Sequence, residues 1–200
     1  MLFKKYLVKF FIFLILFITF ALKSFSLEPE KFVQSTVDRA SQVLSDSISK
    51  EQKIEKLKLI AKDTVDIRGV GFYSLGKYRK TLNNNQKKKY MDLFEKYFLK
   101  SFSSRLSEYS NPKINVNSQE KINENYTIVS STLVATKKRP EVKIDWRVYT
   151  KNPEKPLIRD LIIEGLSLAR TQKEEFASIL NSNDGNINAL FASLEKFINN

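Results

Sequence analysis

Apolar residues recur at helical spacing in the first part of the chain. From Pro29 onward, the spacing of a single buried helix face is kept by Phe32, Val33, Thr36, Val37, Ala40, Val43 and Leu44. Pro29 suits the first turn of a helix, where its missing N–H would have no partner. Ser49 and Gln52 form a capping-box pattern that predicts a second helix, with Ile54, Leu57 and Ala61 facing inward.

A short helix and a long aromatic helix are expected next. The segment Val65–Gly76 carries three of the five glycines of the chain, and Gly76 is placed to end a short helix. The cap residues Asn83–Asn85 precede the longest predicted helix, Gln86–Tyr109. Its apolar stripe is unusually wide, because Met91, Phe94, Phe98, Phe102, Leu106 and Tyr109 are flanked by Tyr90, Leu93 and Tyr97.

The pattern then changes to that of strands. Four strands are expected, at Lys113–Asn117, Tyr126–Thr136, Glu141–Thr150 and Leu157–Leu168. The third alternates strictly and places Val142, Ile144, Trp146 and Val148 on one face. Consecutive strands of this kind form an antiparallel meander with one packed face.

Two more helices close the chain, and the order of elements predicts the fold class. One helix follows a capping-box pattern at Thr171 and Glu174, and the other follows Gly185. Helices, then strands, then helices predict an α+β fold, a four-stranded antiparallel sheet packed against several helices. No repeat or linker divides the chain after residue 26, so we expect a single domain at residues 27–200.

The N-terminus has the pattern of a secretory signal peptide at residues 1–26. Lys4, Lys5 and Lys9 precede an uncharged apolar run from Phe10 to Leu22, and the small residues before position 27 predict cleavage after Ser26. The run is shorter than the about 20 residues that span a bilayer. An uncleaved N-terminal anchor is the alternative, because Lys23 lies close to the cleavage site.

Charge and composition narrow the function. Without residues 1–26 the chain keeps 30 Lys and Arg against 22 Asp and Glu, a net charge of +8. For an exported protein this charge favours anionic membranes or acidic proteins over nucleic acid, although simple solubility explains it equally well. The absence of Cys and His removes disulfides and the usual ligands of soft metals, and also the usual general base. We therefore predict no metal and no cofactor.

Three carboxylates are the candidates for acid–base chemistry. Asp160 and Glu164 lie four residues apart on one predicted strand, and Asp145 lies on its neighbour. Paired carboxylates act as acid and base in isomerases built on a sheet and helices. Solvated carboxylates beside basic residues are the simpler interpretation, so we predict that the protein is not an enzyme.

Two segments give the chain a family resemblance. The first runs from Val65-Asp66-Ile67 to Leu75-Gly76-Lys77-Tyr78-Arg79, and the second is Asp160-Leu161-Ile162-Ile163-Glu164-Gly165-Leu166-Ser167-Leu168. With the long aromatic helix between them, their order and spacing resemble the MlaC family over nearly all of Phe32–Ile198. Members of that family are periplasmic phospholipid-binding proteins that serve an ABC-type lipid transport system.

The resemblance implies a hydrophobic pocket between a curved sheet and the helices, which holds the acyl chains of a phospholipid. By position, the residues expected to line it are Val70, Leu75, Met91, Phe94, Phe98, Phe102, Val142, Ile144, Trp146, Val148, Leu161, Ile163 and Leu166. Structural roles in the two motifs are expected for Asp66, Gly76, Asp160, Gly165 and Ser167. Contact with a headgroup or a partner is expected for the basic cluster Lys77, Arg79, Lys87, Lys88 and Lys89, although a solvated surface explains these residues equally well.

The resemblance also implies how the protein works. It predicts a periplasmic, monomeric carrier that moves phospholipid between an inner-membrane ABC transporter component and an outer-membrane lipoprotein complex. An exported interaction or chaperone-like module with a solid core is the alternative, because a sequence does not distinguish a filled core from a hollow one. The isomerase-like enzyme is the third possibility.

Overall fold

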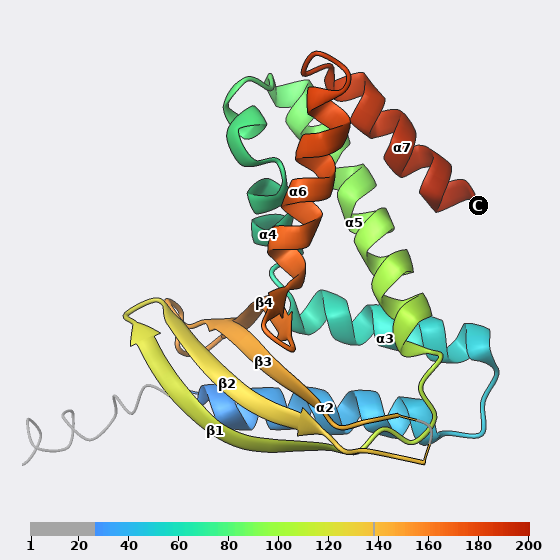
Figure 1. Cartoon of the computed structure of the whole chain (residues 1–200), viewed down its shortest axis with the longest axis vertical. Helices are drawn as coiled ribbons and strands as arrows, with labels where there is room; N and C mark the ends of the chain where they lie inside the picture. Colours follow the sequence, from blue (N-terminus) through green and yellow to red (C-terminus); the bar gives the residue numbers. More distant parts are fainter. Residues whose placement is uncertain (1–26, 138) are drawn as a thin grey trace, which may run out of the picture.

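The described chain is a run of helices, a sheet and two final helices (Figure 1). The computed structural model describes residues 27–137 and 139–200, so the predicted signal peptide lies outside the described residues. The helices before the sheet are α2 (Pro29–Ser45), α3 (Lys50–Thr64), α4 (Ile67–Ser74), the 3₁₀ helix η1 (Gly76–Lys80) and α5 (Asn84–Leu106). The strands are β1 (Ile114–Asn123), β2 (Tyr126–Leu133), β3 (Val142–Tyr149), β4 (Leu157–Ile163) and β5 (Leu166–Ser167). The last helices are α6 (Leu168–Asn181) and α7 (Ile187–Asn199).

The helix-start signals in the sequence are confirmed for α2, α3 and α5. Pro29 occupies the first turn of α2. Ser49 and Gln52 satisfy each other's backbone N–H groups at the start of α3, and Asn83 and Gln86 do the same for α5. Gly76 follows the end of α4 with a φ of 55°, a left-handed conformation that glycine adopts without strain.

The sheet is antiparallel and has five strands in the order β1-β2-β3-β4-β5, so the prediction of four strands is wrong. Glu164 and Gly165 both have positive φ, which is the geometry of a tight two-residue hairpin turn. The turn splits the predicted strand Leu157–Leu168 and folds Leu166 back beside Ile163. Helix α6 then begins at Leu168 with Ser167 as its cap, four residues before the cap at Thr171 that the sequence predicted.

The edge strand β1 is also longer than expected. It continues to Asn123 and pairs with β2 along its length, although its side chains from Ser118 onward are exposed. Exposed positions carry no apolar alternation, so the sequence pattern ends before the strand does.

A bulge in β4 decides which of its residues face the core. Val148 pairs with Ile158 and Arg147 pairs with Asp160, so Arg159 is an extra residue without a cross-strand partner. Beyond the bulge, Leu161 pairs with Trp146 and lies on the packed face of the sheet. Asp160 lies opposite Arg147, on the other face.

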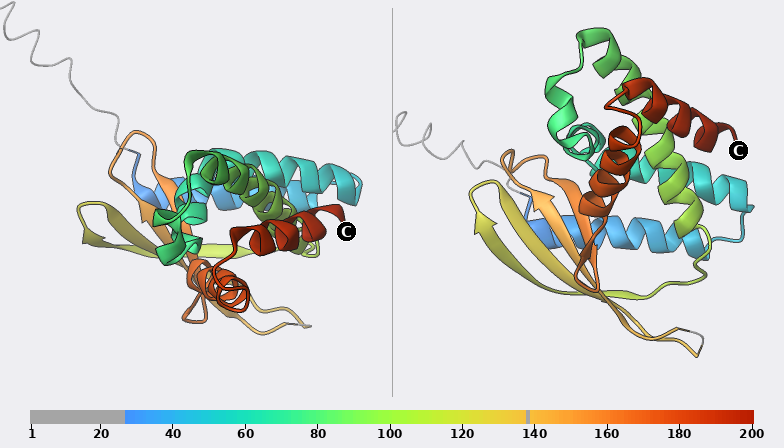
Figure 2. Two further views of the ribbon diagram at one scale, coloured as in Figure 1. Left: turned by 90° about the horizontal axis from the view of Figure 1, so that it is seen from above. Right: turned by 45° about the horizontal axis from the view of Figure 1, so that its top comes forward.

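The apolar interior is divided into two main clusters, which occupy the two halves of the molecule seen in Figure 2. The sheet core packs α2 against the sheet through Phe32, Val33, Val37, Val129, Leu133, Ile144, Trp146, Val148 and Ile158. The helical core joins α4, α5, α6 and α7 through residues that include Val70, Leu75, Tyr90, Phe94, Phe176, Leu180, Leu190 and Phe191. Val65 packs against both cores.

Asp66 and Arg159 join the two halves. The main chain at Val65 forms a parallel bridge with Ile158 at the free side of β4, and the N–H of Asp66 donates to the Ile158 carbonyl at 2.9 Å. Arg159 donates from Nε and Nη2 to Oδ2 of Asp66, each at 2.7 Å. The other carboxylate oxygen of Asp66 accepts the Gly69 N–H at 2.8 Å and so caps α4.

Two tyrosines of the sheet hold the Arg159 guanidinium from the other side. It lies 3.5 Å from the ring centre of Tyr149 and donates to the Tyr126 hydroxyl at 2.7 Å. Burial by itself would lower the pKa of Arg159, but the hydrogen bonds to Tyr126 and Asp66 outweigh it, so the pKa is raised. The charge is therefore retained at the joint between the halves.

We predict that Asp66→Ala destabilises the protein by about 2–4 kcal/mol, because it removes both a helix cap and a partly buried charged hydrogen bond. Asp66→Asn should cost about half as much, because an amide oxygen still caps α4. Urea denaturation measures both values. Asp92→Ala, at an exposed position of α5, is the control. Equal losses of stability in Asp66→Ala and Asp92→Ala would contradict the role of Asp66 in joining the two halves.

Tyr90 gives the helical core a dependence on alkaline pH. Its ring is fully buried and its hydroxyl donates to the Gly71 carbonyl at 3.0 Å. Burial, and to a smaller extent Tyr97, raises the pKa of Tyr90 well above its ordinary value of 10.0. The unfolded chain therefore loses this proton above about pH 10 while the folded chain keeps it.

We predict that stability falls as the pH rises above 10, and that Tyr90→Phe makes this fall shallower by up to about 1.4 kcal/mol per pH unit. At neutral pH the same substitution should cost about 1 kcal/mol for the lost hydrogen bond. Urea denaturation at pH 8 to 11 measures both effects. Tyr73→Phe, at a 41% exposed position, is the control and should leave the dependence of stability on pH unchanged. If Tyr90→Phe also leaves this dependence unchanged, Tyr90 is not its source.

Candidate functional site

Three of the predicted site residues on α5 are phenylalanines whose rings lie in a row, which we call the aromatic ladder. Phe94, Phe98 and Phe102 recur every four residues, so their rings stack along one side of the helix. The ring centres are 6.2 Å and 5.6 Å apart. Phe94 is buried in the helical core and Phe98 packs against it half-buried, whereas Phe102 is half-buried outside the clusters described above. The ladder thus runs from filled core to partly open surface.

The sheet presents a second half-covered apolar edge. Val142, Leu161 and Ile163 are half-buried, and Val142 and Leu161 pack against the margin of the sheet core. Ile163 pairs with Ile144 across β3 and β4. These side chains share the packed face of the sheet because the bulge at Arg159 rotates the strand by one residue.

Ten of the thirteen residues predicted to line one pocket are divided between the two cores, whereas Phe102 and Ile163 are half-buried and belong to neither. In the helical core lie Val70, Leu75, Phe94, and at its margin Met91 and Phe98. In the sheet core lie Ile144, Trp146 and Val148, with Val142 and Leu161 at its margin. Leu166 is 59% exposed at the β4–β5 turn. The pocket between sheet and helices therefore stays a prediction, and its half-buried members are the candidate site.

The second motif forms the start of α6. Asp160 is 5% exposed although it lies on the outer face of the sheet. Its carboxylate accepts the Ser167 hydroxyl at 2.6 Å and the Ala169 N–H at 2.9 Å, and Arg147 lies 3.6 Å away. Ser167 in turn caps α6 by accepting the Arg170 N–H. Gly165, with a φ of 81°, forms the turn that brings these groups together.

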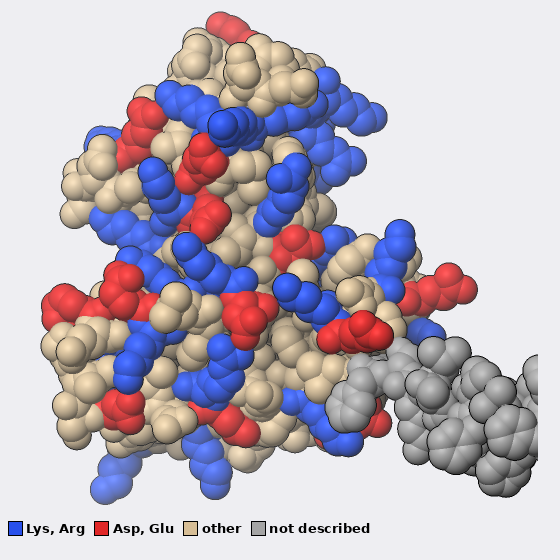
Figure 3. Space-filling view, turned by 180° about the vertical axis from the view of Figure 1, so that it is seen from behind, with Lys and Arg blue, Asp and Glu red and all other residues tan. Residues whose placement is uncertain are grey.

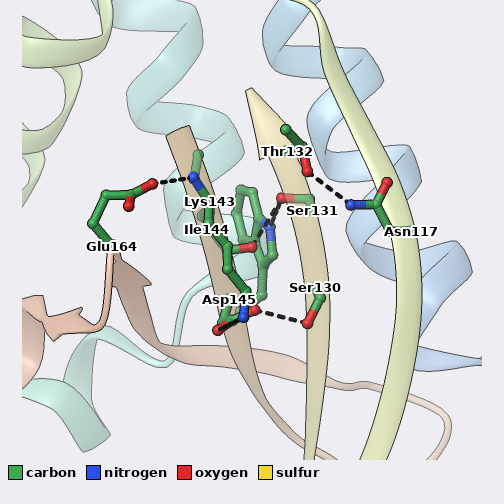
Figure 4. A network of polar contacts seen from close by, with 9 residues as sticks. Asn117, Ser130, Ser131, Thr132, Lys143, Ile144, Asp145 and Glu164 are labelled. Atoms are coloured by element: carbon green, nitrogen blue, oxygen red, sulfur yellow. Dashed lines mark hydrogen bonds and ion pairs between the residues drawn. The ribbon is translucent and has the colours of Figure 1, made fainter. Parts of the chain in front are cut away.

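The carboxylates considered for catalysis have separate hydrogen-bond partners. Figure 4 shows Asp145 accepting the Ser130 hydroxyl, at 2.7 Å, and Glu164 accepting the backbone N–H of Lys143. Asp160 binds the start of α6 instead. Each carboxylate therefore has a local role in the sheet or its turns, and none of these contacts pairs one with another.

Trp146 is held in the sheet core by a polar contact that the sequence did not predict. Its indole N–H donates to the Ser131 hydroxyl at 2.8 Å, and that hydroxyl donates to the Ile144 carbonyl (Figure 4). Ser131 is fully buried. A small hydroxyl at an inward position of β2, across from a tryptophan of β3, is the signal that could have indicated this bond.

The predicted basic cluster lies on η1 and the first turns of α5, at the opposite end of the molecule from the sheet (Figure 1). Lys89 forms an ion pair with Glu195 and lies over Phe191, and Lys77 lies over Tyr78. Arg79 and Lys88 are exposed and Lys87 is half-buried. The cluster is thus remote from the half-buried edge of the sheet.

Residues 27–137 and 139–200 lack two kinds of feature, a membrane-spanning helix and a metal-binding cluster. No helix there combines the length and the apolar character needed to cross a bilayer. The same residues contain no group of three or more carboxylates arranged to hold a metal ion.

Comparisons with known proteins identify the family. The sequence matches the family described as MlaC protein over residues 34–196. A comparison with curated proteins gave no match. Among solved structures, the fold is similar to a phospholipid-binding protein from Ralstonia solanacearum solved in complex with a phospholipid. That protein is 19% identical, with a TM-score of 0.72, and the match covers 86% of this chain and 97% of that chain. The family match spans most of the chain, and the protein belongs to the MlaC family.

Proposed function

We propose that the protein is a phospholipid-binding carrier without catalytic activity. The family match over residues 34–196 carries this proposal, and it is supported by the similarity in fold to a protein that binds a phospholipid. The acyl chains would lie between the aromatic ladder of α5 and the half-buried edge formed by Val142, Leu161 and Ile163. Such a site needs apolar shape and few polar contacts.

The chain would act in the periplasm after removal of residues 1–26. It would be a monomer that receives and delivers lipid at an inner-membrane ABC transporter component and an outer-membrane lipoprotein complex, with no role for nucleic acid. The basic start and apolar run of the N-terminus support export, and family membership supports the partners.

The energy of acyl-chain burial restricts how lipid is released. Each buried CH₂ contributes about 0.8 kcal/mol, so two ordinary chains correspond to about 20 kcal/mol before the costs of binding are subtracted. Spontaneous release into water would therefore be very slow. The carrier must unload while docked to a receiving complex that offers the chains another apolar path.

We predict that the exported, purified protein contains phospholipid in stoichiometric amount, measured by solvent extraction and mass spectrometry. Phe102→Lys should lower the bound lipid at least about tenfold, because it places a charge against acyl carbons. Phe102 is only half-buried, so the variant should keep its circular dichroism spectrum. Ile122→Lys, at a 52% exposed position of β1, is the matched control and should retain its lipid.

The principal alternative is an exported interaction module with a solid core. Complete burial of Tyr90 and near-complete burial of Phe94 and Trp146 favour it, because these large side chains already fill their surroundings. A protein that is empty as purified, and stays empty after incubation with phospholipid vesicles, would establish this alternative and overturn the carrier.

A further inference from the structure

A hollow of about 580 Å³ lies where α3, α5 and the end of α7 meet, apart from the candidate lipid site. Its apolar lining comes from Ile54 and Leu59 of α3, Leu99 of α5 and Ile198 of α7. Leu99 is 6% exposed, whereas Leu59 is 67% exposed. The hollow is therefore a recess with an apolar floor and an exposed leucine at its rim.

Lysines surround this floor. Lys58 and Lys62 are four residues apart on α3, and Lys96 and Lys100 are four apart on α5, so each pair projects from one side of its helix. Glu55 is the one acidic residue among the lining side chains, and it pairs with Lys58 at 2.7 Å. The lining therefore carries a net positive charge.

The lysines differ in how firmly they are held. Lys62 forms an exposed ion pair with Glu95 at 3.2 Å, and Lys100 donates to the Ile198 carbonyl at 2.9 Å. Lys96 takes part in none of the ion pairs found in residues 27–137 and 139–200. Lys62 and Lys96 can thus turn toward an incoming anion at little cost, because exposed ion pairs contribute at most about 1 kcal/mol.

We propose that this hollow is a docking site for an acidic amphipathic helix of a partner protein. Apolar side chains of the helix would enter the recess over Leu99, and its flanking carboxylates would meet the lysines of α3 and α5. This is the way in which amphipathic helices bind apolar grooves with a charged rim. The inference deepens the proposed carrier function and rests on it for the need to dock, while the surface itself is argued from its own shape and charge.

Shape favours a helix over a membrane surface. A flat layer of headgroups cannot reach the nearly buried Leu99, whereas side chains that protrude from a helix can. The net charge of the protein is also not gathered into one flat basic face on the side shown in Figure 3, where Lys and Arg are interspersed with Asp and Glu. The concentrated feature is the recess with its lysine rim.

The test uses a fluorescein-labelled synthetic 18-residue helix with a leucine stripe and glutamate flanks, and measures its binding to the purified protein by fluorescence anisotropy. Leu59→Glu and the double variant Lys62→Glu/Lys96→Glu should each weaken binding at least about tenfold. Ile122→Glu and Lys121→Glu are the matched controls, because both positions are exposed on β1, away from the hollow, and should leave binding unchanged. A peptide with lysine in place of glutamate should not bind.

Several results would overturn the docking site. The glutamate peptide could fail to bind, or the control variants could weaken it as much as the variants of the hollow. Sedimentation with anionic phospholipid vesicles that depends on Leu59, without peptide binding, would assign the surface to membranes instead. Loss of co-purified phospholipid from Leu59→Glu would make the hollow part of the lipid site. Lipid content of the unsubstituted protein is measured separately, so failure of the carrier proposal is distinguishable.

Discussion

The contact between Arg159 and Asp66 determines how the two halves of the molecule are joined. Arg159 is available for it only because a bulge leaves this residue without a partner on β3, so its guanidinium reaches away from the strand ladder to the start of α4. The same bulge places Leu161 on the packed face and Asp160 on the outer face. Asp160 can then bind the start of α6, and both helices that cover the end of β4 are anchored within two residues of each other.

This arrangement gives the protein two main cores, and a smaller cluster of Val43, Leu44, Leu57 and Ile60 packs α2 against α3 beside them. Each core has its own buried side chains, and Val65 is the residue that packs against both. Well-packed cores change shape as units. Under the proposed function, acyl chains would enter by parting the half-buried edges of the two cores, which costs less than opening either one. The polar contacts between Asp66 and Arg159 would keep the two halves aligned while the apolar contacts beside them separate.

Local signals in the sequence predicted most elements, because caps and alternation act within a few residues. Ser49, Asn83 and Pro29 begin helices as expected, and the alternation of β3 reports its packed face. The bulge at Arg159 and the turn at Glu164 were missed for a physical reason. Arg and Glu fit an extended strand as readily as an irregular one, and the partner of the bulged Arg159 is the carboxylate of Asp66, far away in the sequence.

The candidate site was harder to predict than the fold, because burial depends on which core a side chain joins. Phe94, Phe98 and Phe102 have the same residue type and one helical spacing, yet they grade from fully covered to partly open along α5. Nothing in their local sequence encodes that gradient. It arises because α4, α6 and α7 cover the first half of α5, and the hairpin that positions α6 lies some sixty residues further along the chain.

The number of lysines in one stretch of the sequence was likewise a weaker guide to a docking surface than the number of lysines that lie together in the structure. The run Lys87–Lys89 places three lysines next to one another in the sequence, but consecutive residues of a helix point in different directions. Lys89 is accordingly turned toward Glu195 and Phe191. Lys58, Lys62, Lys96 and Lys100 are scattered in the sequence, and they surround one recess because α3 and α5 meet there. An anionic partner responds to the summed field of such a recess, so the lysines that converge there, together with the exposed Leu59, support the proposed docking site.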